Sequence, residues 1–146
     1  MIAAWKSNSD TPETRTVLII SQDTEMVSVW ETLYTQKNCR VISEASAQHG
    51  IQTARLLTPE LIVLHLNLPG DETLALCNHL RPTTNGTLLL LAARRGEREI
   101  SEYYHAGVDE YIFTPISPMA LLIKSMAWLA RQEWFVPRKQ TVQMYS

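Results

Sequence analysis

One histidine stands where chemistry would be expected in this chain. His65 lies near the end of an apolar run at residues 61–66, just before the turn-forming pair Pro69 and Gly70. An imidazole changes charge near neutral pH, so His65 could sense pH or accept a phosphoryl group. Other polar or small residues end or follow apolar runs: Ser21, Gln22, Asn67, Ala92 and Thr114. None of these side chains is a carboxylate or a permanent cation.

The residues around His65 give its imidazole no evident activation. No acid, lysine or metal ligand accompanies it in the sequence, which argues against phosphorylation of His65 itself. We expect a partly buried, neutral histidine bonded to Ser21, Gln22 or the backbone, with pH sensing as a second hypothesis. Asp23 keeps one carboxylate nearby, but its position favours a helix N-cap. No Gly-rich phosphate loop follows the first run and no Ser-His-acid order is present, so we do not expect an enzyme.

Strand and helix patterns alternate along the chain and position these residues. Short apolar runs predict strands at residues 16–21, 39–44, 61–66, 87–92 and 110–113. Apolar spacing and caps predict helices after Asp23 and at residues 47–57, 72–81, 97–105 and 117–131. The first helix carries an apolar stripe of Met26, Val29, Trp30, Leu33 and Tyr34. The last is expected to turn Leu122, Ser125, Met126 and Leu129 inward.

This alternation predicts an α/β protein with a parallel sheet covered by helices on both faces. Right-handed crossovers leave few topologies, of which the doubly wound, flavodoxin-like order 2-1-3-4-5 is the commonest for a chain of this size. Ligands and chemistry in such folds lie at the carboxyl ends of the strands. We therefore expect the residues of the first paragraph to meet at one edge of the sheet.

Several segments resemble the receiver domains of two-component signalling proteins. They are PELIVLHLNLPG at residues 59–70, the helix at residues 74–81, AGVDEY at residues 106–111, and Thr114-Pro115 ahead of Ser117-Pro118. The resemblance covers nearly all of residues 16–131. It implies the CheY-like form of the fold predicted above.

The chain departs from this family where phosphorylation would occur. A working receiver has a phosphoacceptor aspartate at the place of His65, and a pair of acidic residues at the places of Ser21 and Gln22 that holds Mg²⁺. A hydroxyl residue at the place of Ala92 and a lysine at the place of Thr114 bind the phosphoryl group. Because these groups are absent together, the resemblance implies a degenerate site with no metal and no cofactor.

Some family features survive. Asn67 keeps the backbone carbonyl that its family counterpart offers to Mg²⁺, although one carbonyl does not make a metal site. Tyr111 takes the place of an aromatic residue that changes rotamer in receivers, but Ala92 has no hydroxyl to act on it. In DNA-binding subfamilies the fourth helix, fifth strand and fifth helix often form a dimer contact laced with salt bridges. The charges that could serve such a contact here include Arg98, Asp109, Glu110 and Lys124.

Length and composition fit one domain with short flanking segments. We divide the 146 residues into an N-terminal segment 1–15, a receiver-like domain 16–131, and a tail or linker start at 132–146 that contains Trp134, Phe135 and Tyr145. A net charge of −2 argues against non-specific nucleic-acid binding by the domain. The apolar runs are too short to span a membrane, and no signal peptide is recognised, so we expect a cytoplasmic location.

These features predict an atypical receiver, or pseudo-receiver, in a bacterial signalling or transcription-control protein. We expect it to act by protein–protein interaction or dimerisation, without catalysis and without aspartyl phosphorylation. An effector domain beyond the tail is a further expectation. The alternative is a small-molecule sensor that uses the emptied, neutral phosphorylation pocket as its ligand site.

Overall fold

The strands of this chain pair in the order β2-β1-β3-β4-β5, all parallel, in a computed structural model that describes residues 14–134. The strands are β1 (Arg15–Ser21), β2 (Cys39–Glu44), β3 (Leu61–His65), β4 (Thr87–Ala92) and β5 (Glu110–Phe113). The helices are α2 (Thr24–Gln36), α3 (Ala47–Leu57), α4 (Gly70–Leu80), α5 (Glu97–His105) and α6 (Pro118–Trp134), with a 3₁₀ turn, η1 (Arg81–Thr83), after α4. The predicted doubly wound, CheY-like architecture is confirmed.

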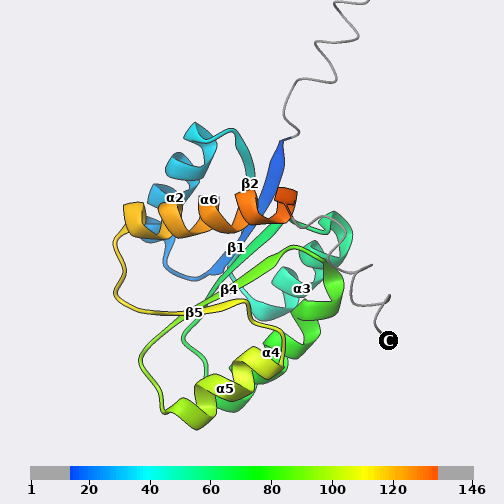
Figure 1. Ribbon diagram of the computed structural model, residues 1–146, viewed down its shortest axis with the longest axis vertical. Helices are drawn as coiled ribbons and strands as arrows, with labels where there is room; N and C mark the ends of the chain where they lie inside the picture. Colours follow the sequence, from blue (N-terminus) through cyan, green and yellow to red (C-terminus); the bar gives the residue numbers. More distant parts are fainter. Residues whose placement is uncertain (1–13, 135–146) are drawn as a thin grey trace, which may run out of the picture.

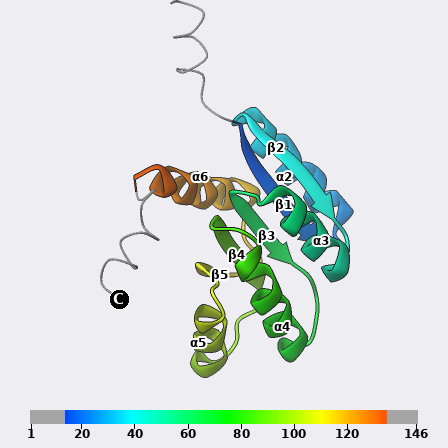
Figure 2. The ribbon, with the colours of Figure 1, turned by 90° about the vertical axis from the view of Figure 1, so that its right-hand side faces the viewer.

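The sheet separates two hydrophobic cores. Helices α2 and α6 cover one face, and α3, α4 and α5 cover the other (Figure 1; Figure 2 shows the same layers after a quarter turn). Along β1, Val17 and Ile19 join the core under α2 and α6, whereas Leu18 and Ile20 join the opposite core. All four side chains are fully buried, which explains the unbroken apolar run in the sequence.

Helix α2 is rotated slightly from the predicted orientation. Val29 is 44% exposed, contrary to the prediction, and Val27 is buried in its place. The buried residues Val27, Trp30 and Tyr34 are spaced three and four apart and share one face, whereas Val29 lies about 100° around the helix from Trp30. Tyr34 fixes this orientation, because its hydroxyl lies 2.7 Å from the buried Ser125 Oγ on α6.

Arg81 organises the amino-terminal edge of the sheet. Its guanidinium donates hydrogen bonds to the carbonyl oxygens of Thr84, Gly86 and Gly107. It also pairs with Asp109 Oδ2 at 3.1 Å. This ion pair places Asp109 at the edge of the sheet opposite to the carboxyl ends of the strands.

Helix α6 continues beyond the predicted domain end. It runs to Trp134, so residues 132–134 of the expected tail are helical, and Gln132 Nε2 donates to Glu60 O at 2.8 Å. Strand β1 begins one residue before the predicted boundary. Residues 1–13 and 135–146, with Phe135 and Tyr145, lie outside the described residues. None of the helices within residues 14–134 is long and apolar enough to cross a membrane.

Candidate functional site at the carboxyl edge of the sheet

Ser21 and His65 meet directly at the carboxyl edge of the sheet. They are register partners on the adjacent strands β1 and β3, and Ser21 Oγ lies 2.9 Å from His65 Nδ1. The same Ser21 oxygen accepts a hydrogen bond from the backbone N–H of Asp23 at 3.1 Å. The Ser21 hydroxyl is therefore free to donate its own hydrogen to His65 Nδ1. A neutral imidazole with its hydrogen on Nε2 accepts this hydrogen bond at Nδ1.

The surroundings of His65 also favour the neutral form. Its ring makes an edge contact with the indole of Trp30, with ring centroids 5.3 Å apart and planes at 80°. Burial lowers the pKa of His65 below its ordinary value, and the carboxylate of Asp23 opposes this shift only in part. Trp30 is itself buried, and its Nε1 has no hydrogen-bond partner among the described residues. The contact with Trp30 was not predicted from the sequence.

The residues present do not fit Mg²⁺, the metal that the fold family implies. Ser21 and His65 bond to each other, and the exposed Gln22 offers only a neutral amide. Asp23 caps α2, because its Oδ1 accepts the backbone N–H of Met26 at 3.0 Å. In residues 14–134, no three side chains of His, Cys, Asp or Glu are grouped so that they could hold a metal ion.

The other predicted positions lie at the same carboxyl edge but make different contacts. Ala92 ends β4 and pairs in register with Phe113, the last residue of β5. Thr114 follows Phe113, and its N–H donates to Ala92 O at 3.0 Å. A cis peptide bond then joins Thr114 to Pro115. Asn67 lies in the loop after β3, and its side chain is exposed.

Tyr111 is held beneath the loop that follows β4. Its hydroxyl donates to Ala93 O at 2.6 Å, and its side chain is buried. Its ring centroid lies 5.6 Å from those of Tyr103 and Phe113. Burial raises the pKa of the Tyr111 phenol, and Arg95 opposes this shift. Sequence reasoning missed the Ala93 acceptor, since nothing in the local pattern marks a loop carbonyl as a partner.

The charges predicted to serve a dimer contact are mostly paired within the chain. Glu110 accepts hydrogen bonds from Lys124 Nζ at 2.7 Å and from Trp128 Nε1 at 2.8 Å. Burial alone would raise the pKa of Glu110, but these two donors outweigh burial and lower it. Asp109 is paired with Arg81, as described above. Arg98 is exposed on α5.

Comparisons with known proteins agree with this architecture. The family model of the response regulator receiver domain matches residues 17–125. The chain is 30% identical to the transcriptional regulatory protein AfsQ1 of Streptomyces coelicolor, over 80% of this chain and 52% of that protein. It is 31% identical to protein PetR of Rhodobacter capsulatus, over 79% of this chain and 48% of that protein. The chain thus spans about half the length of these curated relatives.

Solved structures show the same fold at lower sequence identity. A CheY-like receiver domain protein from Methanospirillum hungatei has a TM-score of 0.74 at 21% identity, covering 83% of this chain and 98% of that one. A two-component response regulator from Clostridium difficile has a TM-score of 0.73 at 21% identity, covering 82% and 98%. The family match over most of the sheet and helices, together with this fold, shows that the chain belongs to the response regulator receiver domain family of two-component signalling systems.

Proposed function

We propose that this receiver domain transmits its signal by protein contact, without aspartyl phosphorylation and without catalysis. The Ser21–His65 hydrogen bond carries the proposal, because it fills the site with a matched neutral pair. Phosphoryl transfer depends on positioned groups that stabilise the transferring charge. Here Thr114 stands at the place of the lysine, and Ala92 offers no hydroxyl. The site therefore lacks an acceptor carboxylate and a cation as well as a metal site.

A phosphoryl-donor experiment tests this proposal. The full chain is incubated with acetyl phosphate and Mg²⁺ and its intact mass is measured, and Mg²⁺ binding is followed separately by calorimetry. We expect no added phosphoryl mass and no saturable Mg²⁺ binding. A receiver that has the phosphoacceptor aspartate serves as the positive control. An adduct that disappears in His65→Ala would show instead that the histidine has become the acceptor.

The proposed contact is self-association through α5, β5 and α6. Four large apolar side chains on these elements are substantially exposed: Tyr104 at 44%, Phe113 at 38%, Met119 at 53% and Ile123 at 64%. The Glu110–Lys124 pair is satisfied inside the chain, so these charges are less available to a second copy. We therefore propose a mainly apolar dimer contact, with Arg98 as a polar contributor at its margin.

The emptied site has less support as a small-molecule sensor. Ser21 Oγ and His65 Nδ1 are bonded to each other, and the Trp30 ring lies against the imidazole. For the whole protein we propose a bacterial, cytoplasmic regulator with an effector region beyond this domain. Support comes from the relatives, among them a DNA-binding response regulator, MtrA, of Mycolicibacterium smegmatis, and from the half-length match.

A further inference from the structure

The outer side of helix α6 carries apolar side chains. Four exposed residues, spaced four, four and three apart, share this side and form what we call the α6 stripe: Met119, Ile123, Ala127 and Ala130. The stripe lies on the opposite side of the helix from the buried Leu121 and Leu129. Between Pro118 and Arg131 the charged residues are Lys124 and Arg131, and neither belongs to the stripe. Helix α6 is therefore apolar on both its core side and its outer side.

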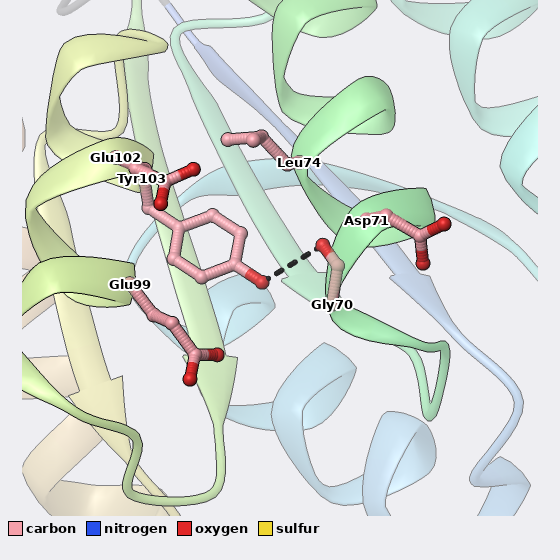
Figure 3. A pocket seen from close by; sticks show the side chains of 6 residues that line it. All are labelled: Gly70, Asp71, Leu74, Glu99, Glu102 and Tyr103. Atoms are coloured by element: carbon pink, nitrogen blue, oxygen red, sulfur yellow. Dashed lines mark hydrogen bonds between the residues drawn. The ribbon is translucent and has the colours of Figure 1, made fainter.

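Helix α5 shows the usual pattern of a surface helix, which α6 lacks. Tyr103 of α5 is buried, and its hydroxyl donates to Gly70 O of α4 at 3.0 Å (Figure 3). Glu99 and Glu102 of the same helix are exposed. A surface helix normally has such polar residues on its outer side, whereas a helix that is apolar all round is normally buried. The α6 stripe is therefore expected to be covered in the assembled protein.

The α6 stripe is complementary to itself when it is turned end for end. Its first half carries large side chains and its second half small ones: Met119 and Ile123, then Ala127 and Ala130. Consider two α6 helices packed antiparallel and centred near Ser125. Ile123 of each copy then faces Ala127 of the other, so that large side chains pack on small ones in both halves of the contact.

A parallel pair of α6 helices would fit less well. It would set Ile123 against Ile123 and leave Ala127 facing Ala127 across a gap, which forfeits packing contacts. It would also bring the two Arg131 side chains together as like charges. In the antiparallel pair the two Arg131 residues are separated by roughly 18 Å along the helices, at a rise of about 1.5 Å per residue. Residue size and charge thus favour the antiparallel pair.

We propose that α6 packs antiparallel against α6 of a second copy of this chain, with Ile123 of each copy on Ala127 of the other. This inference rests on the proposed self-association and specifies its central contact. Small residues at positions 127 and 130 allow the helix axes to approach closely, within the usual range of about 8–10 Å. Lys124 keeps its pairing with Glu110 inside one chain and is not needed for the contact.

Cysteine crosslinking of the full chain tests the arrangement. The variants Ile123→Cys and Ala127→Cys are oxidised separately and as an equal mixture, and disulfide-linked dimers are identified by non-reducing electrophoresis and mass. We expect crosslinked dimers mainly in the mixture, because position 123 of one copy faces position 127 of the other. A mixture of Leu56→Cys and Ala127→Cys is the matched control and should not crosslink, since Leu56 lies on α3 and is 82% exposed. Crosslinks formed mainly within each single variant would indicate a parallel pair and overturn the proposal.

An exchange of large and small side chains gives a second test, read by analytical ultracentrifugation. Ala127→Ile should weaken the dimer about tenfold or more, because two isoleucines would collide where one now faces an alanine. The double variant Ile123→Ala/Ala127→Ile should restore most of the affinity, since a large residue again faces a small one. Tighter association of Ala127→Ile than of the unaltered chain is the result expected of a parallel pair and would overturn the proposal.

The two experiments also separate this inference from the proposed self-association. A dimer in the ultracentrifuge without the crosslink between positions 123 and 127 would contradict the antiparallel α6 contact and leave self-association standing. A monomer at every attainable concentration would contradict both.

Discussion

At the carboxyl end of β3 the His65 imidazole is partly buried, and its neighbours suit a neutral group. Ser21 Oγ accepts the backbone N–H of Asp23 and keeps its own hydrogen available for His65 Nδ1. A charged group would lose hydration here, and Asp23 is the one carboxylate that acts appreciably on the imidazole. Ser21 Oγ and His65 Nδ1 are therefore matched as a neutral pair.

The lowered pKa of His65 predicts that acid destabilises the fold. Folded His65 takes up its proton below its ordinary pKa of about 6.5, so the unfolded chain binds that proton first as the pH falls. The free energy of unfolding should therefore decrease below about pH 6.5 and continue to decrease until the folded pKa is passed. Urea denaturation between about pH 7.5 and about pH 5 measures this loss.

A matched pair of variants isolates the histidine responsible. In His65→Gln the free energy of unfolding should decrease less between about pH 7.5 and about pH 5 than in the unaltered chain. His79→Gln, which removes an exposed histidine on α4, should show the same decrease as the unaltered chain. If the unaltered chain and His65→Gln lost the same free energy of unfolding over this pH range, the role assigned to burial of His65 would be contradicted.

The proximity of Ser21 to His65 could be predicted from the sequence, whereas the contacts around them could not. Adjacent parallel strands bring their carboxyl ends together, so alternating strand and helix patterns were sufficient to place both residues at one edge. The Trp30 contact depends on the rotation of α2, which the predicted stripe with Val29 had slightly wrong. The Tyr111 bond to Ala93 O depends on the path of a loop, which no periodic pattern encodes.

Element boundaries were predicted well where the chain carries strong local signals. Strands β2, β4 and β5 and helices α3 and α5 begin and end at the predicted residues. Helix α4 instead begins at Gly70, two residues before the predicted start, because Pro69 serves as its N-cap and not as part of a free turn. The far end of α6 depends on a tertiary contact: Gln132 donates to Glu60 O and to Thr87 Oγ1. Local spacing cannot reveal such a partner.

The turn before β4 should tolerate no side chain at Gly86. A Cβ there would overlap the carbonyl oxygens of Pro59 and Glu60, which are backbone atoms that cannot move aside cheaply. We expect Gly86→Ala to lower the free energy of unfolding by about 1–3 kcal/mol, the usual cost of overpacking. Gly96→Ala is the control, because a Cβ there meets nothing within 4 Å, and it should cost no more than about 0.5 kcal/mol as an N-cap change. Equal urea midpoints for both variants would contradict this account.

For the molecule as a whole, four of the large exposed apolar side chains lie on α5, β5 and α6, the elements of the proposed contact surface. Phe113, Met119 and Ile123 come from β5 and α6, and Tyr104 lies on the neighbouring α5. Arg94 stacks on Phe113, with its guanidinium carbon 4.2 Å from the ring centroid. A symmetric dimer would bring two such surfaces together.

Self-association should therefore depend on apolar contact and little on ionic strength. We expect Ile123→Lys to weaken the dimer at least tenfold, measured by analytical ultracentrifugation over a range of protein concentrations. Leu56→Lys adds the same charge at a residue that is 82% exposed on α3, and it should have no effect. Added salt should change the dissociation constant little, since Glu110 and Lys124 already pair inside one chain. A monomer at every attainable concentration would contradict the proposed dimer.

The contacts among Ser21, His65 and Trp30 also constrain which substitutions the site tolerates. Changing His65 to aspartate alone would remove the ring that Trp30 packs against and leave a carboxylate with neither a metal site nor a cation beside it. Acidic residues introduced at positions 21 and 22 alone would place two negative charges side by side without a bound cation to neutralise them. Each of these substitutions made alone is therefore expected to lower the stability of the domain. The consequence is that Ser21, His65 and Trp30 are coupled, so substitutions at these three positions should not be additive in their effect on stability.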